Sequence, residues 1–206
     1  TVLGTKPASD SFRPSYCGSE KTVRYATSDI VGDTYLNNLP PINAPDLATV
    51  ENYFEKPWID HQGQWSGRFT HPLDNMPDYG REISGQIGIG ALMLNVDFSQ
   101  LPGNPSKDTL LHRYIQLGID LYGIVENMGD NDIWPPDGGH ATGRKLPILF
   151  AGLMLDDEGM KSIGFLSGDY LYSPGHGPEN APADYIYFGE DAQTFYVRKN
   201  PNHESV

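Results

Sequence analysis

The chain has 206 residues, a net charge of −13 and a sequence pI of about 4.6. A surface that binds nucleic acid needs clustered Lys and Arg, and an anionic membrane repels an acidic protein, so we expect neither as a partner. Cys17 is the only cysteine, which excludes an internal disulfide bond, and no apolar run is long enough to span a bilayer.

The first part of the chain is rich in proline and glycine and has little periodicity. We expect residues 1–46 to form an extended, loop-rich arm with one short strand near Thr22 to Tyr25. A short helix is predicted over 47–55, because its sequence LATVENYFE is followed by Pro57. The polar and aromatic stretch that begins at Trp58 is long, and long loops inside compact domains tend to be functional.

A second helix is predicted from Asp78 to about Val96, where apolar residues recur at helical spacing. Asp78 is a suitable N-cap. The helix contains Gly85, Gly88 and Gly90, each of which costs ~1 kcal/mol of helix propensity relative to alanine. Glycine at this spacing indicates that another helix approaches closely.

Two further helices are predicted over 107–126 and 144–156, the first with Ser106 as its N-cap. Asp120 lies in the apolar stretch of the first, and we interpret it as a buried structural carboxylate that needs an arginine or a backbone amide as its partner. The second contains LPILFAGLML, which is apolar all round and indicates a wholly buried helix. The sequence DDEGM then begins another short helical segment.

The tail from residue 164 is rich in tyrosine and predicts short strands at Tyr185–Phe188 and Thr194–Val197. We therefore expect a mainly α protein with a helical domain over 47–163, a loop-rich arm before it and a tail, 164–206, that continues the same domain. Helical hairpins with one buried helix each favour part of an (α/α) toroid with long loops. A complete toroid needs more helices than the sequence predicts, so we expect a smaller helical domain or, from the abrupt start and end, a piece of a longer polypeptide.

The chain resembles the middle portion of large secreted bacterial proteins in six strings: DSFRPSYCG (10–18), WIDH (58–61), HPLDNMPDYGREI (71–83), YIQLGIDLYGI (114–124), DGGHATGRKLPILFAGLMLDD (137–157) and FGEDAQTFYV (188–197). Those proteins resemble polysaccharide lyases and glycoside hydrolases with (α/α)-toroid folds. The resemblance implies a toroid fold, a polysaccharide substrate and a secreted or periplasmic location. In similar lyases, a Tyr or His removes the proton next to a uronate carboxyl group, and Asn, His or Arg neutralises that carboxylate.

The connection between the last two long helices carries the strongest candidate site. His140 is a candidate general base near neutral pH, and Arg144 can hold a carboxylate with two hydrogen bonds. Trp134 can stack on a sugar ring, while Asp137 and Lys145 are further candidates for substrate binding. The structural alternative is an ordinary helix start, capped by a threonine, in which the histidine bonds to the backbone.

A second candidate group comprises His71, Asp74, Asn75, Asp78, Tyr79, Arg81 and Glu82. Asp78 and Glu82 stand four residues apart, on one face of a helix start, and paired carboxylates are the usual apparatus of glycoside hydrolysis. Tyr79 is instead a candidate acid or base for a lyase. The structural alternative is that Asp78 caps its helix and Glu82 pairs with a neighbouring cation.

A third group, near Trp58 and His61, suits a sugar subsite, although Trp58 can equally anchor its loop on the core. We expect no cofactor, because the six histidines are dispersed and form no metal-binding motif. A Ca²⁺ ion in the Asp-rich stretch 130–137 is the alternative, but that stretch lacks the EF-hand spacing.

The leading hypothesis is a polysaccharide lyase that acts by β-elimination, with His140 or Tyr79 as base or acid and Arg144 with Asn75 on the substrate carboxylate. Arg144 and Lys145 favour an anionic substrate, because they are cations in an acidic chain. The first alternative is a glycoside hydrolase, which the many carboxylates favour. The second is a non-catalytic carbohydrate-binding or structural subunit of an extracellular assembly, whose partner is further polypeptide or a second copy.

Overall fold

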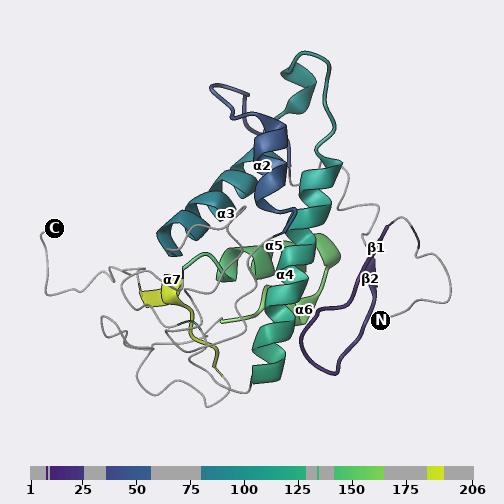
Figure 1. Ribbon diagram of the computed structural model, residues 1–206, viewed down its shortest axis with the longest axis vertical. Coiled ribbons are helices and arrows are strands. Elements are labelled where there is room, and N and C mark those ends of the chain that lie inside the picture. Colours follow the sequence, from purple (N-terminus) through teal and green to yellow (C-terminus); the bar gives the residue numbers. More distant parts are fainter. Residues whose placement is uncertain are drawn as a thin grey trace, which may run out of the picture.

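The computed structural model describes residues 8, 10–25, 36–56, 80–128, 134, 142–164 and 185–192, without the side chains of 80–82, 128 and 192. Helices account for 53% of the residues described, which confirms the prediction of a mainly α protein. The elements, labelled in Figure 1, are β1 (Ser11–Phe12), β2 (Arg24–Tyr25), α2 (Leu47–Tyr53), α3 (Gly80–Leu94), the 3-10 turn η2 (Phe98–Gln100), α4 (Asp108–Met128), α5 (Lys145–Leu155), α6 (Glu158–Lys161) and α7 (Gly189–Ala192).

The central element is α4, which contacts α2, α3 and α5. Its residue Tyr114 is fully buried, and its hydroxyl donates a hydrogen bond to the carbonyl of Ile87 in α3 at 3.1 Å. The same ring packs on Phe54, just after α2, and on Phe150 in α5. Burial raises the pKa of Tyr114, so the hydroxyl stays a neutral donor. One side chain thus joins four helical segments of the core.

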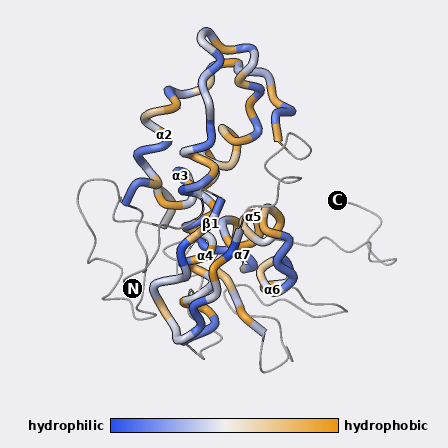
Figure 2. Tube along the Cα trace, turned by 90° about the vertical axis from the view of Figure 1, so that its right-hand side faces the viewer, coloured by the Kyte–Doolittle hydropathy of each residue, from blue (hydrophilic) through white to orange (hydrophobic). Residues whose placement is uncertain are grey.

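The helix α5 runs across α4 (Figure 1) and is strongly hydrophobic (Figure 2). The two helices touch at Gly118, where a Cβ atom would collide with the carbonyl of Pro147 and lie 2.6 Å from the Ala151 methyl group. The expected burial on all sides is wrong on one face, because Leu146 and Leu153 are 42% and 41% exposed. Their side chains lie on a side of α5 that does not face α4.

Only one of the three glycines predicted to mark a close approach does so among the described residues. A Cβ atom at Gly90 would lie 2.5 Å from the ring of Phe54 and 3.1 Å from the ring of Tyr114. At Gly85 and Gly88, no described atom lies within 4 Å of the corresponding position. The close neighbour of α3 is therefore the aromatic end of α2, which packs near one glycine.

Short polar side chains cap the starts of α2 and α4. Ser106 accepts a hydrogen bond from the amide of Asp108 at 3.1 Å, which confirms it as the cap of α4. At α2 the cap is Asp46, whose carboxylate accepts the amide of Thr49 at 2.9 Å and its hydroxyl at 3.0 Å. Each cap satisfies one of the amide donors that a helix start leaves unpaired.

Replacing Asp46 by alanine is expected to lower the free energy of unfolding by about 1 kcal/mol, because the Thr49 amide loses its acceptor. Urea denaturation followed by circular dichroism measures the change. Asp46→Asn is the matched control, since asparagine caps equally well and should stay close to the original stability. Equal losses in both variants would assign the effect to charge and contradict the capping role.

The arm and the tail are both attached to the helical core. The arm forms an antiparallel pair, Ser11 with Tyr25 and Phe12 with Arg24, which confirms the expected strand at its last two residues. The tail segment 185–188 is not a strand, since it makes a single parallel bridge, from Phe188 to Trp134, before α7 begins. Phe12 and Phe188 belong to the same hydrophobic cluster as the helices. The strand expected at 194–197 lies outside the described residues. No described helix combines the length and apolar character needed to cross a membrane.

Candidate functional site

Most of the predicted site residues lie outside the part of the chain that the structure describes: Trp58, His61, His71, Asn75, Asp78, Tyr79, Asp137 and His140. Glu82 lies in α3, but its side chain is not described. Three predicted site residues are described with their side chains, namely Trp134, Arg144 and Lys145. Among the described residues, no group of three His, Cys, Asp or Glu side chains could hold a metal ion. The alternative Ca²⁺ stretch, 130–137, is described only at Trp134.

Trp134 is fully buried. Its ring lies 5.8 Å from that of Phe188, at an interplanar angle of 31°, and the two residues form a backbone bridge. The sequence makes this indole a candidate for stacking on a sugar ring. In the structure protein atoms cover the ring, so its position fits an anchor of the connection better than a platform for a substrate.

The two predicted cations are engaged with protein groups. Arg144 is 3% exposed, and its guanidinium donates a hydrogen bond to the carbonyl of Thr142. Lys145 forms an ion pair with Asp191 and donates to the carbonyl of Gly164 at 3.1 Å. To bind a substrate carboxylate, these side chains would have to leave buried or partly buried partners, which carries a desolvation and pairing penalty. Their geometry therefore favours a structural role at the start of α5.

A carboxylate from the tail caps α5. The Oε1 atom of Glu190 accepts the amides of Gly143, Arg144 and Lys145 at 2.7, 2.7 and 3.0 Å. The threonine of the structural alternative is Thr142, but these three amides pair with Glu190 instead. Sequence reasoning missed Glu190, although the acidic pair in FGEDA was visible, because nothing local indicates which distant helix start a carboxylate will reach.

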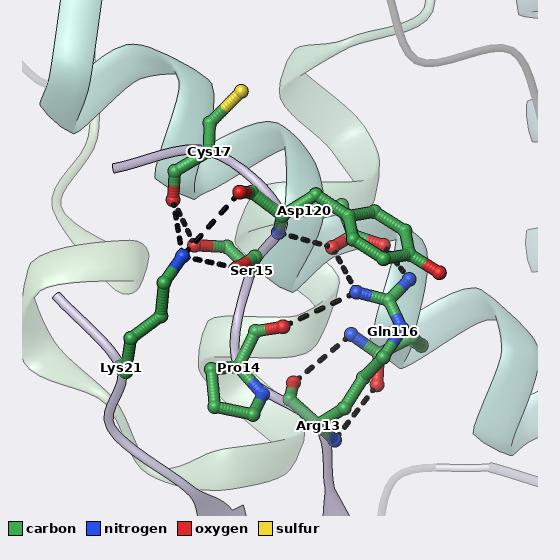
Figure 3. Close-up of polar contacts among 8 residues, drawn as sticks. Arg13, Pro14, Ser15, Cys17, Lys21, Gln116 and Asp120 are labelled. Atoms are coloured by element: carbon green, nitrogen blue, oxygen red, sulfur yellow. Dashed lines mark hydrogen bonds and ion pairs between the residues drawn. The ribbon is translucent and has the colours of Figure 1, made fainter. Parts of the chain in front are cut away.

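A second polar cluster ties the arm to the middle of α4 (Figure 3). Asp120 is 1% exposed and forms a two-pronged ion pair with Arg13, whose Nη1 lies 2.6 Å from Oδ1. The amide of Tyr16 also donates to Oδ1, at 3.3 Å. One turn earlier, Gln116 exchanges two hydrogen bonds of 3.1 Å with the backbone of Arg13. The predicted structural carboxylate is confirmed, with both kinds of partner that its burial required.

The environment of this cluster keeps the Cys17 thiol protonated at neutral pH. Burial raises the pKa of Asp120, and Arg13 offsets part of that shift. Burial, with a contribution from Asp120, also raises the pKa of the Cys17 thiol, so Cys17 is not an activated nucleophile. Lys21 donates to the carbonyls of Ser15, at 2.9 Å, and of Cys17, at 3.3 Å. The cluster is a clamp that holds the arm on α4.

The described side chains thus form two attachments rather than a set of reacting groups. One attachment holds the arm on α4, and the other holds the connection between α4 and α5. Residues that could react, His140 and Asp137 among them, belong to that connection. No family model matches the chain, and the comparisons with curated proteins and with solved structures give no match either.

Proposed function

We propose that the chain belongs to a carbohydrate-active enzyme that cleaves a polysaccharide by β-elimination. The observation that supports the proposal is the attachment of the 135–141 connection at both ends, at Trp134 through Phe188 and at Gly143 through Glu190. Catalysis requires side chains held within a fraction of an ångström by rigid neighbours. A polar connection that carries a histidine, and whose flanking residues are held in this way, suits that requirement.

In this proposal His140 removes the proton next to a uronate carboxyl group. The electron pair of the broken C–H bond forms a double bond within the sugar, and the bond to the glycosidic oxygen breaks. Tyr79 returns a proton to that leaving oxygen. Asn75 and His71 bind the substrate carboxylate, whereas Arg144 and Lys145 hold the start of α5. Trp58 and His61 contribute a sugar subsite, and no metal or other cofactor takes part.

We also propose that the helices are part of a toroid-like arrangement in a secreted or periplasmic protein, with further polypeptide or a second copy as partner. The burial of α4 beneath α2, α3 and α5 supports an inner helix surrounded by others. Because α5 runs across α4 (Figure 1), the hairpin repeat of a toroid would have to come from other helices. Antiparallel neighbours are what such a repeat requires.

The ion pair of Lys145 with Asp191 favours a second candidate function, glycoside hydrolysis. An anionic substrate calls for free cations in the connection, whereas Lys145 is neutralised by Asp191 within the protein. A neutral polysaccharide would then be the substrate, and Asp78, Glu82 and Asp137 would supply the acid and the base. Asp78 and Glu82 stand four residues apart in the sequence, which suits that alternative.

Product analysis separates these functions. The chain is incubated with neutral and uronate polysaccharides, and the products are weighed by mass spectrometry. β-Elimination predicts products with unsaturated, ultraviolet-absorbing ends, and His140→Ala is expected to lower the rate about 100-fold because a general base is lost. His203→Ala, a histidine outside the proposed site, is the matched control and should keep the rate.

Other products would contradict the lyase. Products that have gained one water would assign hydrolysis, and activity should then depend on Asp78 and Glu82. Equal rates for His140→Ala and His203→Ala would remove His140 from the mechanism. The absence of cleavage for every polymer would contradict both enzymes and favour the carbohydrate-binding or assembly subunit.

A further inference from the structure

One short segment of the tail, residues 188–191, contacts both ends of the 135–141 connection. Phe188 packs on Trp134 at the beginning of the connection. Glu190 and Asp191 hold its end, the first through three amides and the second through the ammonium group of Lys145. One tail segment thus contacts described residues on both sides of the connection.

The start of α5 depends on this contact because it lacks a cap of its own. Arg144 occupies the N-cap position and makes no capping hydrogen bond through its side chain, and the first turn holds no acidic residue. Unpaired amides and the helix dipole make a helix start favourable for a carboxylate. Glu190 supplies that carboxylate through hydrogen bonds strengthened by its charge.

The residues beside this contact restrict the positions that the start of α5 and the tail segment can take. Gly143 has a φ of 90°, and a Cβ atom there would lie 2.9 Å from the Cα atom of Ser84 in α3. On the other side, Asp191 accepts the hydroxyl of Tyr185 at 3.3 Å and the amide of Phe188 at 3.2 Å. The chain before α5 is therefore confined between α3 and a tail segment that is itself held in place.

We propose that Glu190 is a positioning residue for the proposed reaction, which fixes the start of α5 by binding the amides of 143–145 from outside the connection. His140 precedes the first of these amides by only three residues, so catalysis by His140 depends on where the helix starts. The effect of Glu190 on catalysis rests on the proposed function. The binding of the α5 amides by Glu190 does not depend on it.

Hydrogen–deuterium exchange tests whether Glu190 holds the start of α5. In Glu190→Ala, the amides of 143–145 should exchange about tenfold faster, because the loss of a helix cap exposes them. Glu190→Gln should fall between this variant and the original protein, since an amide oxygen still accepts hydrogen bonds but lacks the charge. Glu55→Ala, which removes an exposed carboxylate after α2, is the matched control and should leave 143–145 unchanged.

Kinetics test the catalytic consequence. If Glu190 positions His140, Glu190→Ala should lower kcat about tenfold or more with little change in KM, because the reacting group is displaced while the substrate still binds. Acetate should restore part of kcat and part of the exchange protection in Glu190→Ala, because it can occupy the space beside the α5 amides. Acetate should not affect the Glu55→Ala control.

Three results would overturn the proposal. Unchanged exchange at 143–145 in Glu190→Ala would show that the carboxylate does not hold the helix start. Faster exchange with unchanged kcat would reduce Glu190 to a structural cap. Faster exchange throughout the chain in both Glu190→Ala and Glu190→Gln, with no acetate effect, would indicate general unfolding. If the original chain cleaves no polysaccharide, the proposed function fails, and exchange at 143–145 still decides whether Glu190 holds the connection.

Discussion

Arg13→Ala is expected to lower the free energy of unfolding at pH 7 by about 3 kcal/mol, because it leaves a buried carboxylate without its cation. Asp120 is 1% exposed, and Arg13 supplies both prongs of its ion pair. We place the effect at the lower end of the range for buried pairs, since the Arg13 side chain is itself 36% exposed. Urea denaturation measures the loss. Lys161→Ala, which breaks ion pairs to the exposed Asp156 and Glu158, is the control and should change stability little.

The pH dependence of Arg13→Ala identifies the cause of the loss. Burial raises the pKa of Asp120 and Arg13 lowers it, so removing Arg13 raises the pKa further. A carboxyl group whose pKa is higher in the folded than in the unfolded protein destabilises the fold as pH rises through the folded value. The stability deficit of Arg13→Ala should therefore shrink as pH falls below 7. A deficit that stays constant with pH would assign the loss to the packing of Arg13 on the Tyr16 ring instead.

A double variant completes this test. Replacing both partners, as in Arg13→Met with Asp120→Leu, removes the unpaired charge together with its cation. This variant should be more stable than Arg13→Ala alone, because apolar groups of similar volume need no partner. A double variant as unstable as Arg13→Ala would contradict the ion-pair explanation.

Gly118→Ala is expected to lower the free energy of unfolding by about 3 kcal/mol, because the added methyl group would collide with α5. The collision is with the carbonyl of Pro147 and with Ala151, at 2.6 Å, and a backbone atom cannot move aside as a flexible side chain can. Chemical denaturation, with the amide exchange of α4 and α5 as a local readout, measures the effect.

The matched control is Gly85→Ala in α3. No described atom lies within 4 Å of its Cβ position, so the variant should gain about 1 kcal/mol from helix propensity alone. The two substitutions are chemically identical and differ only in what surrounds them. Equal effects of the two substitutions would contradict the close contact of α4 with α5.

The helices α2, α4 and α5 were predictable to within about two residues, the usual uncertainty of a helix end. Their signals are local: apolar residues at helical spacing, a cap at Ser106 and a stop before Pro57. The face of α5 that carries Leu146 and Leu153 was not predictable in the same way. An apolar helix shows its composition in the sequence, but not which of its sides a neighbour will cover.

Asp120 separates what the sequence determined from what the tertiary structure decided. A carboxylate inside an apolar helix must find a partner, so burial and pairing followed from the sequence of α4 alone. The identity of the partner did not, because Arg13 lies 107 residues away. The cap of α5 repeats this division: a helix start needs an acceptor, and only the folded chain shows that Glu190 supplies it. Local spacing determines which groups need a partner, while packing between distant segments decides which groups meet.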